Sequence, residues 1–148
     1  MTSQIAFFKS HPKPMRVLLL TNLIYALVMP IVELFVGAYI MRNSSDLSLV
    51  VIFQLAVYTG IPLTFLINGY LLNGVKIAWL YSLGMLLSGV SMFAMMSLNE
   101  LSTFGIFFAG LIMGLSYGFF WANRDFLALN TTNDSNRNYY YGIETFFY

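Results

Sequence analysis

The chain has 148 residues, of which only 9% are charged and 59% are hydrophobic, and its mean hydropathy is +0.75. An average soluble domain is about 25% charged, so this composition excludes an ordinary soluble protein, and it excludes intrinsic disorder as well. A formal net charge of +1 provides no basic surface for nucleic acid. Because the chain has no cysteine, disulfides and thiolate metal sites are also excluded. We therefore predict an all-α membrane protein whose first partner is membrane lipid.

Residues 1–16 contain Lys9, Lys13 and Arg16 and are predicted to form a cytoplasmic N-terminal arm. A membrane-spanning helix needs roughly 20 mostly apolar residues. Four stretches after the arm meet this length, and only one of them is interrupted by a charge: residues 17–41, 47–75, 77–99 and 101–123. Short polar connections between them predict antiparallel neighbours, so 17–123 should form a four-helix transmembrane bundle.

The distribution of Lys and Arg predicts the orientation of this bundle in the membrane. With the N-terminus in the cytoplasm, six basic residues lie inside: Lys9, Lys13, Arg16, Lys76, Arg124 and Arg137. Only Arg42 then lies outside. We therefore expect a multi-pass membrane protein with a cytoplasmic N-terminus.

Residues 124–141 are predicted to form a cytoplasmic loop, because 130–138 are rich in Asn, Ser and Thr. Apolar and aromatic residues then return, and 142–148 are expected to begin a fifth transmembrane helix that continues in further helices of the same protein. The alternative is an aromatic tail at the membrane interface of a complete four-helix protein.

Polar residues inside the spans are the candidates for a substrate or proton pathway. An ionisable group at mid-bilayer costs at least about 2.5–3.5 kcal/mol, so Glu33 should face a bundle interior or a wet cavity rather than lipid. Asn22 lies on the same helical face as Glu33, and Tyr25 lies at the edge of that face. Gln54 and Tyr58 share a face of the second span. We predict that Glu33 carries a proton; the alternative is a protonated structural acid with neighbours that only hold the helices together.

Small residues recur every fourth position in the fourth span. Gly110, Gly114 and Gly118 form a stripe that lets another helix approach closely, so we predict helix packing as their role. At the end of this span, Arg124 and Asp125 are expected either to belong to a cytoplasmic gate or to be solvated helix ends.

The chain is not predicted to be an enzyme, and no catalytic residue, metal site or cofactor is expected. The segment 114–118 matches G-x-S-x-G, but Ser116 lies inside an apolar span and the single histidine, His11, lies in the arm. A nucleophile elbow needs a strand before the serine and a histidine in its triad.

The chain resembles the N-terminal part of a major facilitator superfamily transporter. The resemblance depends on the four spans and on the segments 110–124, 131–132, 137 and 141–144. The resemblance implies a six-helix half within about twelve helices, with a small-molecule substrate bound between the halves near the midplane. It implies alternating access driven by an ion gradient, often of protons, for which Glu33 is the candidate.

The connection between the second and third spans departs from the usual pattern of that family. Segment 69–76 keeps glycines and Lys76, but Asn73 stands where an Asp is expected. Asn73 and Lys76 are counted with Arg124 and Asp125 as the candidate cytoplasmic gate. The alternative function is a complete small four-helix membrane protein, either an oligomer similar to a small multidrug exporter or a membrane scaffold.

Overall fold

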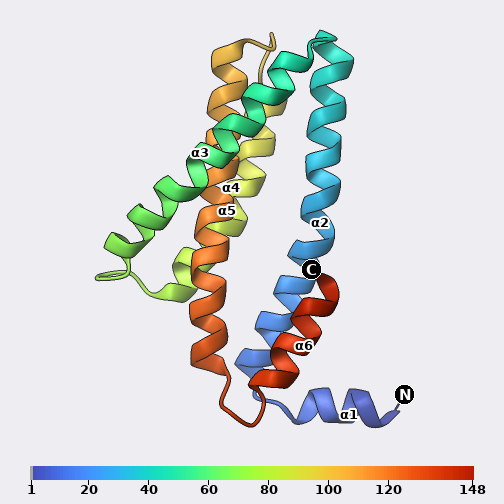
Figure 1. Cartoon of the computed structure of the whole chain (residues 1–148), viewed down its shortest axis with the longest axis vertical. Coiled ribbons are helices and arrows are strands. Elements are labelled where there is room, and N and C mark those ends of the chain that lie inside the picture. The colour runs from blue at the N-terminus through green and yellow to red at the C-terminus, as the bar shows by residue number, and fades with distance from the viewer. Residues whose placement is uncertain (1) are drawn as a thin grey trace. The chain divides into compact units, whose positions relative to one another are not determined.

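The structure is a computed structural model that describes residues 2–148, and within that range the chain is helical and contains no strand. Figure 1 labels the helices: α1 (Thr2–Ser10), α2 (Lys13–Ser44), α3 (Leu47–Leu71), α4 (Ile77–Met96), α5 (Thr103–Thr131) and α6 (Arg137–Phe147). Four of them, α2 to α5, are long and apolar enough to cross a membrane. The prediction of an all-α chain with four candidate spans is thereby confirmed.

The helix boundaries differ from the predicted arm and loop. Residues 1–16 include α1, and α2 already begins at Lys13. The predicted loop over 124–141 is wrong as a structural element, because α5 continues to Thr131 and α6 begins at Arg137, before 142. A hydropathy pattern reports where apolar residues stop, whereas a helix continues through polar residues as long as its backbone hydrogen bonds are formed.

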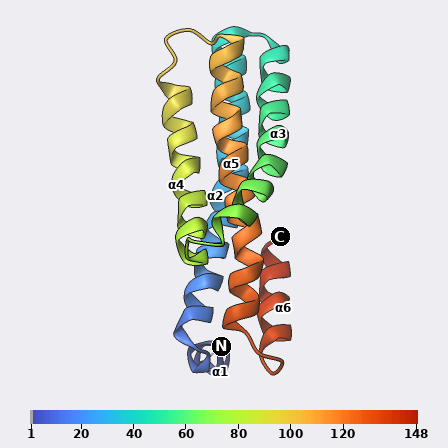
Figure 2. The ribbon, with the colours of Figure 1, turned by 90° about the vertical axis from the view of Figure 1, so that its left-hand side faces the viewer.

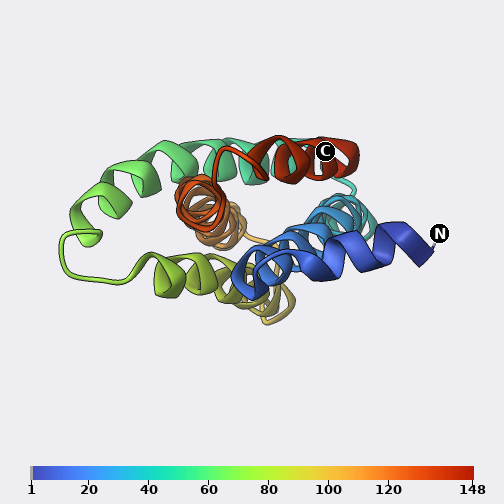
Figure 3. The same ribbon diagram turned by 90° about the horizontal axis from the view of Figure 1, so that it is seen from below.

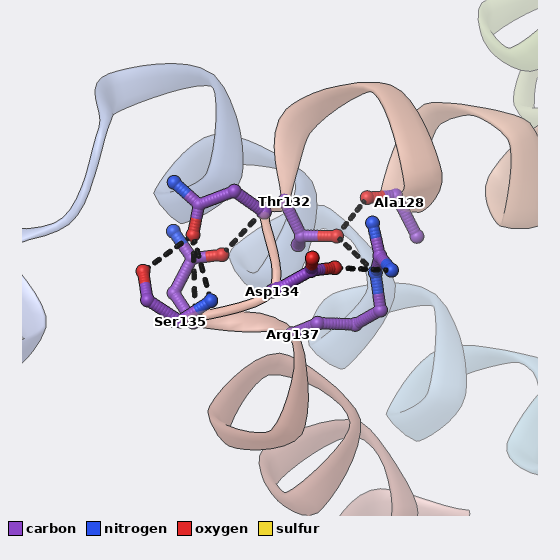
Figure 4. Close-up of polar contacts among 7 residues, drawn as sticks. Ala128, Thr132, Asp134, Ser135 and Arg137 are labelled. Carbon is purple, nitrogen blue, oxygen red and sulfur yellow. Dashed lines mark hydrogen bonds and ion pairs between the residues drawn. The ribbon is translucent and has the colours of Figure 1, made fainter.

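The connection between α5 and α6 is a short turn over residues 132–136 that polar side chains close (Figure 4). The Thr132 hydroxyl donates to the Ala128 carbonyl at 2.7 Å, and the Asn133 side chain accepts the backbone N–H of Ser135 at 3.2 Å. Arg137 forms an ion pair with Asp134 at 3.1 Å. The bonds of Thr132 and Asn133 satisfy backbone groups near the helix ends, and the ion pair joins two side chains across the turn.

The connection between α2 and α3 is shorter still. Ser45 adopts a positive φ of 53°, the left-handed conformation that commonly ends a helix. Asp46 then caps α3, because its carboxylate accepts the backbone N–H of Ser48 at 2.9 Å and the Ser48 hydroxyl at 2.6 Å. These hydrogen bonds from the Ser48 hydroxyl and backbone lower the pKa of Asp46 below its ordinary value.

The chain divides into two compact units, and α2 and α5 contribute one part to each. The first unit contains the chain up to Val32 together with Asp125–Tyr148, and so includes α1 and α6. The second unit is Glu33–Arg124. In the first unit, α1 runs out from the beginning of α2 to the N-terminus (Figure 3).

In the second unit, α5 lies between α3 and α4 (Figure 2). The predicted stripe faces α3: a Cβ atom added at Gly110 would lie 2.6 Å from the Phe53 carbonyl oxygen, and one at Gly114 would lie 2.9 Å from the Cα of Gly60. A Cβ at Gly118 would meet Thr64 at under 3.0 Å. The two backbones therefore approach as closely as a helix pair with glycine at its contact allows.

On its other side, α5 contacts α4 through buried hydroxyl groups. The Ser116 hydroxyl donates to the Gly84 carbonyl at 2.6 Å, and the Ser91 hydroxyl donates to the Ala109 carbonyl at 2.8 Å. Ser91 and Ser116 are both fully buried. Ser116, the serine of the G-x-S-x-G match, thus donates a hydrogen bond from α5 to α4.

Candidate functional site

Glu33 lies on α2 in the second unit, and its closest polar partner comes from α5. The Tyr117 hydroxyl donates to Glu33 Oε1 at 2.5 Å, across a separation of 84 residues. Tyr117 is buried, whereas the residue Glu33 is exposed in this chain. A carboxylate held by a phenol on one side and uncovered on the other can change its hydrogen bonding when it gains a proton, because a protonated carboxyl becomes a donor.

The predicted pathway residues of α3 lie in different environments. Tyr58 is 69% exposed, and Gln54 is half-buried. Further along the same helix, Asn68 is buried against α5, where the Asn123 amide donates to its oxygen at 2.7 Å. Asn68 and Asn123 therefore join two helices by a buried amide pair, which the face pattern of α3 alone did not reveal.

In the first unit, three buried polar side chains meet between α2 and α6. The Asn22 amide donates to the Tyr140 hydroxyl at 2.9 Å and to Glu144 Oε1 at 3.1 Å. The Tyr140 hydroxyl lies 3.4 Å from the same carboxylate oxygen. The side chains are all buried: Asn22 is 2% exposed, Tyr140 0% and Glu144 8%. We call these three residues the Asn22 cluster.

The Asn22 cluster changes the interpretation of two predicted pathway residues. Asn22 hydrogen-bonds to α6 rather than lining an open cavity, so its position suits a structural link between α2 and α6. Tyr25, one turn further along α2, is also buried. Glu144 and Tyr140 were not predicted as site residues, although an acid inside the aromatic segment 139–148 was a signal that could have found Glu144.

Removing the amide of Asn22 is expected to loosen α6. In Asn22→Ala, the buried Glu144 carboxylate and Tyr140 hydroxyl lose a donor, which costs about 1–3 kcal/mol. Hydrogen exchange measured by mass spectrometry should then show faster exchange of the α6 amides. Asn138→Ala, at an exposed position of α6, is the matched control and should leave the rates unchanged. Equal exchange rates of the α6 amides in Asn22→Ala and wild type would contradict a stabilising link between Asn22 and α6.

Two of the predicted gate residues lie in the connection between α3 and α4, and the other two, Arg124 and Asp125, lie within α5 rather than at its end. Asn73 and Lys76 are exposed in the connection between α3 and α4. The Arg124 guanidinium lies 4.5 Å from the centre of the Trp121 ring on the same helix, a cation–π contact. Asp125 is exposed on α5.

Comparisons with known proteins find two distant bacterial relatives. The chain is 25% identical over 119 residues to "Uncharacterized protein in sodM 3'region" of Geobacillus stearothermophilus, covering 80% of this chain and 56% of that protein. It is 22% identical over 120 residues to "Uncharacterized protein YqgE" of Bacillus subtilis (strain 168), covering 81% of this chain and 28% of that protein. The chain thus spans about half the length of the first relative and under a third of the second. No protein-family profile and no solved structure matches the chain.

Proposed function

We propose that the chain supplies the first helices of a secondary active transporter, which moves a small solute across the bacterial inner membrane by alternating access coupled to protons. The observation that carries the proposal is the hydrogen bond of 2.5 Å from Tyr117 to Glu33, the one acidic residue of the first apolar span. Facing lipid, an acid at this depth would cost at least about 2.5–3.5 kcal/mol.

The exposure of Glu33 supports a larger assembly around this chain. Within residues 4–148, Tyr117 on α5 is the one residue that hydrogen-bonds to the carboxyl group, and Glu33 is otherwise exposed in the isolated chain. We propose that further helices of the same protein cover Glu33 and enclose a wet cavity, as in the six-helix halves of the major facilitator superfamily. The greater length of both relatives agrees with such an assembly.

Transport is tested with the whole protein in liposomes that contain a pH-sensitive dye. A solute gradient of sugars, amino acids, peptides or organic cations, applied one class at a time, should change the internal pH for one class only. Vesicles without protein are the control. A protein that moves no proton with any class of solute would remove proton coupling from the proposal.

The proposed orientation places the connection between α4 and α5 outside and that between α3 and α4 inside. Because residues 1–148 contain no native cysteine, labelling above that of the protein without an added cysteine reports the side of the membrane on which an introduced cysteine lies. In intact cells, Glu100→Cys should react with an impermeant thiol reagent, and Asn73→Cys should react only after the cells are opened. Both residues are exposed, so both positions are open to the reagent. The opposite labelling would invert the orientation.

A further inference from the structure

In the part of the chain whose side chains are described, three basic residues near the start of α2 have no acidic partner. No hydrogen bond or ion pair engages the side chains of Lys9, Lys13 and Arg16 within residues 4–148, whose side chains the structure describes. Arg16 is only half-exposed, and its Nε is buried with no hydrogen-bond partner there. A buried N–H without an acceptor is costly, so this guanidinium calls for an anionic or polar group.

An apolar cavity of about 290 Å³ lies in the same unit as these basic residues. Its walls come from three helices: Ile5 and Phe8 of α1, Leu19, Leu20 and Leu23 of α2, and Ile143 of α6. Arg16 precedes Leu19 and Leu20 by three and four residues, so it lies next to them on one face of α2. Lys13 precedes Arg16 by three residues and extends that face to the N-terminal end of α2.

Aromatic rings hold α1 at the rim of this cavity. The His11 ring stacks on the Tyr139 ring of α6 with centroids 4.6 Å apart, and Phe7 meets Tyr139 edge-on at 5.1 Å. The Nδ1 of His11 lies 2.8 Å from the Phe7 carbonyl oxygen. These contacts keep Lys9, at the end of α1, near the start of α2, where Lys13 and Arg16 lie.

We propose that this end of the first unit binds one anionic phospholipid. The lipid phosphate accepts hydrogen bonds from Arg16 and meets the charges of Lys9 and Lys13, and an acyl chain occupies the apolar cavity. Basic pockets at the membrane surface beside transmembrane helices suit anionic headgroups, and burial of acyl methylene groups in an apolar cavity adds to the affinity. A free phosphate would use the cations and leave the cavity empty, so the combined chemistry favours a lipid.

The proposal is tested by native mass spectrometry of the whole protein released from detergent. Phosphatidylglycerol should be retained at least about tenfold better than phosphatidylcholine with the same acyl chains. Arg16→Gln and the double variant Lys9→Gln/Lys13→Gln should each lose most of this preference. Arg42→Gln, at the other end of α2, is the matched control and should keep it.

A second pair of variants tests the cavity itself. Leu20→Trp fills the cavity from a half-exposed position and should lower retention of phosphatidylglycerol, whereas Leu27→Trp, exposed on the same helix but outside the cavity, should not. Circular dichroism verifies that each variant folds. If Arg16→Gln does not fold, the double variant Lys9→Gln/Lys13→Gln tests whether the basic residues are needed for lipid retention. Equal retention of the two lipids, equal losses in Arg16→Gln and Arg42→Gln, or displacement of the lipid by inorganic phosphate alone would each overturn the proposal.

Discussion

Glu33→Gln is expected to abolish solute-coupled proton movement by the whole protein while leaving its amount in the membrane unchanged. Glutamine keeps the size of the side chain, and its amide oxygen can accept the hydrogen bond from the Tyr117 hydroxyl, but it cannot bind and release a proton at neutral pH. In dye-loaded liposomes, the solute-driven change of internal pH should fall to the level of vesicles without protein. Because Glu33 is already open in this chain, a neutral amide there should not disturb packing.

Two further variants make the test of Glu33 specific. Glu100→Gln removes an exposed acid outside the candidate spans and should leave proton movement unchanged. Tyr117→Phe deletes the hydroxyl at 2.5 Å, and loss of a hydrogen bond to a charged group costs about 1.5–3 kcal/mol, so activity should fall roughly tenfold or more without vanishing. Full proton coupling in Glu33→Gln would exclude this carboxyl as the carrier.

Gly114→Leu is expected to prevent the second unit from folding. Even a Cβ atom at this position would come within 2.9 Å of the Gly60 Cα and closer still to the Val57 carbonyl oxygen, and both belong to the backbone of α3. Backbone atoms cannot move aside as a flexible side chain can, so α3 and α5 would have to separate. Overpacking of one or two methyl groups already costs about 1–3 kcal/mol, and leucine adds more.

Fluorescence-detected size-exclusion chromatography of a tagged protein measures this loss. Gly114→Leu should replace the single symmetric peak with aggregate, and Gly114→Ala should lower the midpoint of thermal unfolding. Gly89→Leu is the matched control, because an added Cβ there meets nothing within 4 Å. A symmetric peak for Gly114→Leu, with wild-type thermal stability, would show that the close approach of α3 and α5 is not required.

The apolar spans could be predicted from sequence because their signal is local. A run of some twenty apolar residues is sufficient to mark a helix that can cross a bilayer, and α2 to α5 follow the predicted stretches within a few residues at most ends. The exception is the C-terminal end of α5, where polar residues after Asn123 continue the helix to Thr131. Polarity there predicted a loop, but helix formation depends on backbone geometry that polar side chains do not forbid.

The polar contacts could be predicted only in part. Asn22 and Glu33 stood out because polar groups are rare in apolar spans, but their partners Tyr140 and Tyr117 are 118 and 84 residues away. Without known distances between helices, a tyrosine in an aromatic segment is indistinguishable from an interface anchor. For the same reason, the sequence does not identify Glu144 as a partner of Asn22, and only the packing of α6 against α2 brings the two together.

By itself, the amino-acid sequence determined that the chain is helical, that four segments are long and apolar enough to cross a membrane, and that Gly110, Gly114 and Gly118 share one helical face. These properties depend on residue type and on spacing along one helix. Only the tertiary structure decided that this face meets α3, that Tyr117 bonds to Glu33, and that Asn22 bonds to α6. Such pairings depend on which helices pack together and in what register, and hydropathy contains no information about either.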